Sequence, residues 1–261
     1  MTQLPFALQL HSIQDECAAN LPKALEQVAA MGYEGVEFAG YYGYPAAELR
    51  EMLDDLGLAV VGTHAWYRHV PLIGPGTEAY VVEAVAESRV LGNKILIDIG
   101  DVPFAAKAQK SAAGWIERAE LFNALARRLA RDGLWVGYHN HAFEFEELVE
   151  GERIWDILIE HLAQEVLIEL DTGSTFRGGG DVLAVLEQCA GRVRTVHLKA
   201  HSRSLGTRPL IGEDDLPWSE ILDLCQTVAG TEWYIVEYES DGYPRLEAVR
   251  RCLDALQAMV G

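Results

Sequence analysis

Amphipathic helical stretches alternate with short apolar runs along the chain, and a glycine separates the two. Four stretches show this clearly: Ala24–Met31, Glu48–Leu56, Thr77–Leu91 and Trp115–Arg131, followed by Gly32, Gly57, Gly92 and Gly133. Each glycine stands where a helix ends in the left-handed conformation that glycine adopts at little cost. The pattern therefore predicts helices that end at these glycines and strands that begin just after them.

Eight apolar runs are expected to form strands. They are Phe6–Leu10, Gly35–Ala39, Ala59–Thr63, Lys94–Gly100, Leu134–His139, Val166–Asp171, Val193–Lys199 and Trp233–Glu239. The runs are nearly continuous in apolar residues, which is typical of parallel strands covered on both faces. Strict alternation of strands and helices indicates right-handed βαβ units, and eight such units in about 250 residues is the usual size of a (β/α)8 TIM barrel.

A doubly wound open sheet is the alternative fold. It usually has a glycine-rich turn after its first strand, whereas this chain reads LHSIQDE there. We therefore expect a TIM barrel formed by residues 1–261 as a single domain, because no linker or low-complexity tract divides the sequence.

Composition limits the classes of partner. The 261 residues are 49% hydrophobic, and 21 Lys and Arg against 40 Asp and Glu give a net charge of −19. Nucleic acids and anionic membranes require a basic surface, so we expect neither as a partner. No apolar run is long enough to span a membrane, the N-terminus lacks a signal peptide, and four scattered cysteines are typical of a reduced, cytoplasmic protein. An assembly of identical chains is left open.

Ionisable residues collect at the C-terminal ends of the expected strands, and five of the eight histidines stand there. The strand-end residues are Gln9, His11, Glu37, His64, Trp66, Asp98, Asp101, His139, His141, Asp171, His197, Lys199, Glu237 and Glu239. In a TIM barrel these ends form one mouth, which carries the active site. Carboxylates crowded in a mouth repel one another unless a cation holds them, so the set predicts a divalent metal site.

The motifs YHNHAFEF, ELDTGS, VHLK and IVEYE at the ends of the last four strands resemble the sugar phosphate isomerase/epimerase family, which has a xylose isomerase-like TIM barrel. The resemblance runs over the whole chain. It implies a divalent ion, Mn²⁺ before Zn²⁺, Co²⁺ or Mg²⁺, held by one residue from each of these strands. Carried over by motif, three of the ligands are Asp171, His197 and Glu237.

The fifth strand departs from the family pattern, because His139 stands where the family usually has a glutamate ligand. Glu144 lies just beyond and is the alternative fourth ligand. His139 and His141 are two residues apart, so both can point into the mouth. Glu237 is the expected base on one face of the substrate, and His141, Glu144 or His139 is the opposing group.

Other residues are candidates for contacting the substrate. Glu37, His64 and Lys199 match pocket positions in similar proteins, and Arg203 resembles a sugar-contacting arginine of the ketohexose epimerases, with a solvated loop residue as the alternative. Trp66, Tyr67 and Trp115 are candidates for walling a sugar ring or for packing. Gly178–Gly180 could bind a phosphate, but they stand directly before Asp181, a residue typical of a helix N-cap. Entry into a helix capped by Asp181 explains these glycines without a ligand.

The resemblance predicts a metal-dependent isomerase or epimerase that acts on a keto-sugar or related polyol through an enediolate. The same site would make a dehydratase or lyase of an inosose or a 3-keto-sugar if the enediolate expelled a β-substituent. An endonuclease for apurinic sites fits poorly with the charge of −19. If His139 in place of the usual glutamate on strand five abolishes metal binding, the chain is instead expected to be a non-catalytic binding protein.

Overall fold

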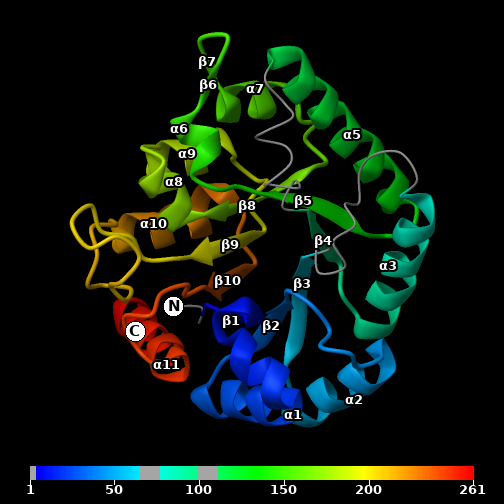
Figure 1. Ribbon diagram of the computed structural model, residues 1–261, viewed down its shortest axis with the longest axis vertical. Coiled ribbons are helices and arrows are strands. Elements are labelled where there is room, and N and C mark those ends of the chain that lie inside the picture. Colours follow the sequence, from blue (N-terminus) through cyan, green and yellow to red (C-terminus); the bar gives the residue numbers. More distant parts are fainter. Residues whose placement is uncertain (1–3, 65–76, 99–110) are drawn as a thin grey trace.

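The computed structural model describes residues 4–64, 77–98 and 111–261. Within them, eight parallel strands form a closed barrel in the order β1-β10-β9-β8-β5-β4-β3-β2, with helices outside it (Figure 1). The strands are β1 (Phe6–Gln9), β2 (Gly35–Phe38), β3 (Ala59–His64), β4 (Ile95–Asp98), β5 (Trp135–His139), β8 (Leu167–Asp171), β9 (Thr195–Leu198) and β10 (Trp233–Val236). The expected TIM barrel is confirmed, and the open sheet is excluded because β1 pairs with both β2 and β10.

Each expected strand is present, but most are shorter than the apolar run that predicted them. β9 begins at Thr195 rather than Val193, and β10 ends at Val236 rather than Glu239. Lys199, Glu237 and Glu239 follow the C-terminal ends of these two strands at the mouth, and the Glu237 backbone N–H still bonds to the Leu198 carbonyl. The apolar pattern marks burial, and burial extends past the residues assigned to each strand.

The helices complete the βα units. They are α1 (Gln14–Met31), α2 (Ala46–Leu56), α3 (Glu78–Leu91), α5 (Ala112–Ala130), α6 (Phe143–Glu146), α7 (Ile154–His161), α8 (Thr172–Arg177), α9 (Val182–Gln188), α10 (Trp218–Leu224) and α11 (Arg245–Val260). A short hairpin of β6 (Leu148–Val149) and β7 (Glu152–Arg153) follows α6. Three of the expected glycine stops are confirmed, because α1, α2 and α3 end at Gly32, Gly57 and Gly92 in the left-handed conformation. The fourth differs: α5 ends at Ala130, and Gly133 belongs to the turn that follows.

The main core lies between the barrel and its surrounding helices, and Trp115 is fully buried in it. Trp115 therefore packs rather than lines the mouth. Two small apolar clusters lie apart from this core, one of Ala7, Val61 and Ile235 and one of Ile95, Ile97 and Leu167. All six of these residues are on barrel strands, and Ala59 and Trp233 at the starts of β3 and β10 pack against the first cluster. The two clusters therefore fill the N-terminal part of the barrel interior.

In the described part of the chain, no helix combines the length and the apolar character that a membrane span needs. The four cysteines are free and buried, as expected for reduced thiols. Burial raises the pKa of the Cys17 thiol to about 12, so this side chain packs as a small apolar group.

Candidate metal centre

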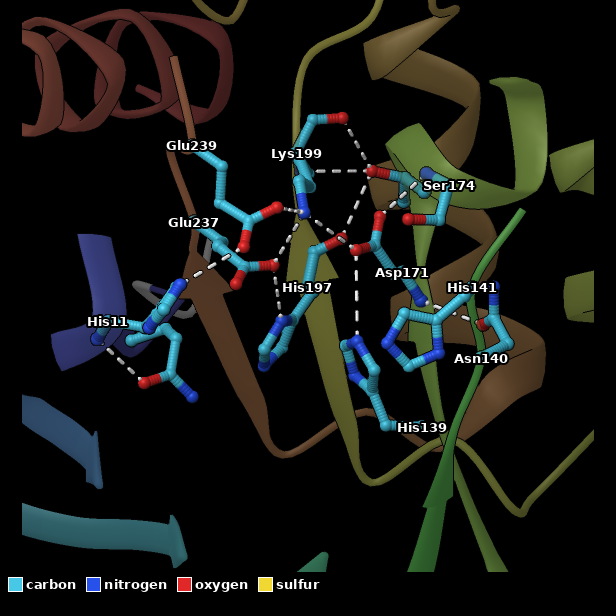
Figure 2. Close-up of polar contacts among 12 residues, drawn as sticks. His11, His139, Asn140, His141, Asp171, Ser174, His197, Lys199, Glu237 and Glu239 are labelled. Carbon is cyan, nitrogen blue, oxygen red and sulfur yellow. Dashed lines mark hydrogen bonds and ion pairs between the residues drawn. The ribbon is translucent and has the colours of Figure 1, made fainter. Parts of the chain in front are cut away.

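The C-terminal half of the barrel interior is filled by ionisable side chains. Successive residues of a strand point to opposite faces, so positions two apart share a face. Glu169 and Asp171 therefore point to the barrel axis from β8, and His197 and Lys199 do so from β9. Figure 2 shows His139, Asp171, His197, Lys199 and Glu237 converging on one space at the mouth.

An outer group of four buried residues has the donor set of a metal site. One ligand atom from each of His139, Asp171, His197 and Glu237 lies within 4.8 Å of the corresponding atoms of the other three. His139 Nε2 is 3.8 Å from Asp171 Oδ2, and His197 Nδ1 is 3.0 Å from Glu237 Oε2. Each of the four comes from a different barrel strand or from the residue just after it, namely β5, β8, β9 and β10.

The residues of the outer group fit a divalent ion. Asp171 Oδ2 is buried and accepts no hydrogen bond from the described residues, although the Lys199 ammonium lies 3.4 Å from it. Such a carboxylate oxygen is costly to bury unless a cation completes its shell. Two imidazoles and two carboxylates form a mixed nitrogen and oxygen donor set that suits Mn²⁺, Zn²⁺ or Co²⁺.

The Lys199 ammonium provides a positive charge beside the two carboxylates of the outer group. It lies 3.2 Å from Glu237 Oε2 and also pairs with Glu239, whose other oxygen is 3.3 Å from His11 Nε2. Burial lowers the pKa of Lys199, but Asp171, Glu237 and Glu239 outweigh it and raise that pKa well above its ordinary value. Lys199 is therefore a permanent cation here.

An inner group lies deeper in the barrel and consists of Glu37, His64 and Glu169. His64 Nε2 is 3.1 Å from Glu37 Oε2 and 2.9 Å from Glu169 Oε1. Both carboxylates are fully buried. The inner and outer groups share contacts, because His139 and His197 reach the inner carboxylates through their other ring nitrogens.

The two outer histidines differ in charge. Burial lowers the pKa of His139. The hydrogen bond to Glu169 raises this pKa and the charge of His197 lowers it, and the net shift is downward, so His139 is neutral at pH 7. Burial also lowers the pKa of His197, but Glu169, Glu37 and Glu237 raise it well above its ordinary value. Without a metal ion, His197 is therefore a cation.

Glu144 lies outside both groups. Its Oε1 accepts a 2.7 Å hydrogen bond from the Tyr138 hydroxyl, and its Oε2 accepts a 2.8 Å bond from the His141 backbone N–H. These bonds fold the short helix α6 back onto the end of β5. His141 itself faces the mouth, and its Nδ1 is buried with no hydrogen-bond partner among the described residues. Assignment of the fourth ligand to His139 or Glu144 thus stays a prediction, and the geometry favours His139.

The remaining candidates fall in different places. Glu37, His64 and Lys199 lie in the interior described above, whereas Trp66 and Tyr67 lie outside the described residues. Arg203 is exposed, and its guanidinium lies 4.9 Å from the centre of the Phe176 ring. Asp181 caps α9 through bonds to the N–H groups of Leu183 and Ala184. Packing and backbone conformation account for the preceding glycines, because a Cβ at Gly178 or Gly180 would overlap Ala142 or Phe145 and Gly179 has φ +80°.

Sequence reasoning missed Glu169. It stands inside the run VLIELD, which reads as a nearly continuous buried strand, and its fully buried side chain contacts three histidines. Its position two residues before Asp171 carries the signal, because the two share a face. Gln9 was noted at a strand end without a role, and its amide donates a 2.7 Å bond to Glu37 Oε2.

Known proteins resemble this chain in sequence or in structure. An inosose dehydratase from Erwinia tasmaniensis is 24% identical over 251 residues, which cover 83% of this chain and 82% of that protein. A crystal structure of a sugar phosphate isomerase/epimerase from Parabacteroides distasonis superposes with a TM-score of 0.79 at 22% identity, covering 96% of both chains. A D-psicose 3-epimerase crystallised with D-fructose gives a TM-score of 0.72 at 16% identity, covering 99% and 100%.

Family membership follows from a match that spans most of the chain. The family described as a xylose isomerase-like TIM barrel matches residues 25–259, which include every residue of the outer and inner groups. This confirms the family resemblance that the strand-end motifs indicated. The chain belongs to the xylose isomerase-like TIM barrel family.

Proposed function

We propose that the protein is a metal-dependent isomerase or epimerase of a keto-sugar or related polyol. The observation that carries this proposal is the outer group, in which His139, Asp171, His197 and Glu237 direct four donor atoms at one buried space. These residues would hold the ion, with Mn²⁺ as the expected metal. A divalent ion bound there would act as a Lewis acid on the substrate carbonyl and neighbouring hydroxyl.

Glu237 is suited to remove the proton from the carbon next to the carbonyl. Burial raises the pKa of Glu237, but the charges of Lys199 and His197 outweigh it and hold that pKa well below its ordinary value. The group is therefore a carboxylate at neutral pH. Its Oε2 contacts Lys199 and His197, so we assign proton abstraction to Oε1.

His141 is suited to be the proton donor on the substrate face opposite Glu237. It stands at the end of β5, on the side of the mouth away from Glu237 (Figure 2), and its buried Nδ1 has no hydrogen-bond partner among the described residues, with Glu144 Oε1 3.9 Å away. A base on one face and an acid on the other give epimerisation. If Glu237 alone moved the proton to the adjacent carbon, the outcome would be aldose–ketose isomerisation.

Lys199 and the surrounding acids support an unphosphorylated substrate. The Lys199 ammonium is neutralised by Asp171, Glu237 and Glu239, and Arg203 is exposed on Phe176. A phosphate dianion would meet a net negative mouth. We therefore assign Lys199 to a substrate hydroxyl or carbonyl, and Glu37 and His64 to support beneath the substrate.

Dehydration of an inosose is the second candidate, because the curated relative from Erwinia tasmaniensis is named an inosose dehydratase at 24% identity over 83% of this chain. The first step would be the same. Loss of a β-hydroxyl as water from the enediolate would then follow, with the proton supplied by an acid at the mouth. A cytoplasmic location, in keeping with the free cysteines, belongs to the same proposal.

Solvent exchange tests the shared step and separates the outcomes. Metal-loaded protein is incubated in D₂O with a panel of free ketoses, their phosphates and inososes, and the products are followed by mass spectrometry and NMR. Epimerisation or isomerisation retains the elements of the substrate and places deuterium next to the carbonyl, whereas dehydration removes one water. The absence of both deuterium uptake and product formation for every member of the panel, with the metal bound, would contradict the proposal.

A further inference from the structure

Each outer histidine lies between two sets of carboxylates. His139 directs Nε2 toward Asp171 Oδ2 at 3.8 Å and Nδ1 toward Glu169 Oε1 at 3.1 Å. His197 is turned the other way: its Nδ1 is 3.0 Å from Glu237 Oε2, and its Nε2 is 2.6 Å from Glu37 Oε2. One nitrogen of each ring thus faces the outer group, and the other faces the inner carboxylates.

A neutral imidazole has one N–H donor and one lone-pair nitrogen, and a metal ion binds the lone pair. A carboxylate beside one nitrogen keeps the proton there and leaves the opposite nitrogen for the metal. The inner carboxylates are therefore placed to decide how each histidine presents itself to an ion.

We propose that Glu169 and Glu37 are positioning residues that make the two histidines bind the metal through opposite nitrogens, His139 through Nε2 and His197 through Nδ1. This inference rests on the metal centre proposed above. It concerns residues beneath that centre which would not touch the ion or the substrate.

The inner carboxylates are themselves held in place. Glu169 Oε2 accepts a 2.7 Å bond from the Thr195 hydroxyl, and Glu37 Oε2 accepts a 2.7 Å bond from the Gln9 amide. His64 lies between them and contacts both. Because each carboxylate has a partner other than the outer histidines, its acceptor oxygen is fixed before any metal arrives.

A second set of donor atoms lies within metal-binding distance: one ligand atom from each of His64 and Glu169 of the inner group and of His139 and His197 of the outer group lies within 4.8 Å of the others. Both donor sets draw on His139 and His197. Two ions bound at once would need both nitrogens of each ring, so each imidazole would have to lose its second proton. The shared histidines therefore favour one ion in the outer group, with the inner group as its support.

Nitrogen-15 NMR tests the assignment directly. In protein labelled with ¹⁵N at histidine and loaded with diamagnetic Zn²⁺, long-range ¹H–¹⁵N spectra distinguish protonated from metal-bound ring nitrogens. The expected result is a protonated Nδ1 on His139 and a protonated Nε2 on His197. The same pattern on both rings, or the reverse pattern, overturns the proposal.

Metal affinity of two matched variants gives an independent readout. E169M removes the acceptor, and E169Q keeps an acceptor oxygen of nearly the same shape. Loss of such a support typically weakens metal affinity about 10–100-fold, so we expect this for E169M and a smaller loss for E169Q. T63V is the control, because Thr63 is buried on β3 and its hydroxyl contacts Asn93.

Competition titration with a chromophoric chelator measures affinity and stoichiometry without any substrate. Wild-type affinity for E169M, or two tightly bound ions per wild-type chain, overturns the proposal. If E169M does not fold in a thermal melt, E169Q and the wild-type NMR spectra decide the outcome. Failure of the proposed function would appear differently, as a protein that binds one ion with this nitrogen pattern and turns over no keto-sugar or inosose.

Discussion

Two layers of the barrel interior differ in chemistry although they lie two residues apart on the same strands. Ile235 and Leu167 belong to the apolar clusters near the N-terminal end, whereas Glu237 and Glu169 project in the same direction one step further along. On β5, Gly137 precedes His139 in the same way. The apolar layer fills the barrel and needs no particular partner, while every member of the polar layer depends on the charges around it.

The two layers should therefore respond differently to substitution. Apolar burial contributes roughly 25 cal/mol per Å² and is lost in proportion to the volume removed. Buried charges are tolerated because they are paired, so removal of one member leaves others uncompensated. Changes in the apolar layer should lower stability and spare metal binding, whereas changes in the polar layer should weaken metal binding in addition to any loss of stability.

The largest effect is expected for His197→Ala. Four-ligand metal sites bind with roughly 10–16 kcal/mol, so the loss of one ligand should cost about 3–4 kcal/mol, or several hundred-fold in affinity. Turnover should disappear with the metal while the far-ultraviolet circular dichroism of the barrel persists. His161→Ala is the control, because His161 lies on α7 and bonds to the Ile157 carbonyl. Full metal occupancy in H197A would show that His197 is not a ligand.

Ile235→Ala tests the apolar layer. Ile235 is fully buried against Ala7 and Val61, and truncation of a buried isoleucine costs about 3 kcal/mol of unfolding free energy. Urea denaturation of the metal-free protein measures this loss. Metal affinity of the folded variant should stay within twofold of wild type. A much larger loss of affinity would mean that the two layers are not separable.

Two glycine-to-alanine substitutions, one in each layer, compare the layers, because the added Cβ would meet a side chain too closely at both positions. A Cβ at Gly62 would overlap Glu37 Oε1, whereas a Cβ at Gly137 would lie 2.6 Å from Ile97 Cδ1. Overpacking of this kind typically costs about 1–3 kcal/mol, so both variants should be less stable by this amount. G62A should also weaken metal binding severalfold, because Glu37 must move away from His197. Equal metal affinities of G62A and G137A would argue against this role of Glu37.

The charge assigned to the polar layer also predicts that metal binding depends on pH. Glu169, Glu37 and Glu237 raise the pKa of His197 well above its ordinary value against the effect of burial, so the ring holds an extra proton in the metal-free protein. A metal ion displaces that proton, and its affinity should therefore rise with pH, about tenfold per unit while one proton is released. Calorimetry in buffers of different ionisation enthalpy counts the protons. Binding that releases none would contradict the assigned charge.

Much of the fold could be predicted from the sequence, because the glycine stops and apolar runs are local signals. Gly57 ends α2 where the pattern placed it, and the continuous apolar runs marked strands buried on both faces. Strand ends were less certain, since burial continues beyond the sheet. Residues such as Glu237 therefore appeared as strand residues although they follow β10.

The site was predictable as a set but not in its internal order. His139, Asp171, His197 and Glu237 were all candidates, because strand ends of a barrel meet at one mouth. Glu144 was an equal candidate with His139, since the bonds of Glu144 to Tyr138 and to the His141 backbone depend on the turn into α6. Glu169 escaped notice because a lone acid in an apolar strand has no local pattern that marks its function.

Anomalous diffraction from crystals of the Mn²⁺-loaded protein tests the central claim most directly. The account predicts one strong peak at the mouth, bonded to His139 Nε2, Asp171, His197 Nδ1 and Glu237, with Glu169 and Glu37 behind the two imidazoles. A peak bonded to Glu144, or a peak among Glu37, His64 and Glu169 in place of the outer position, would contradict it.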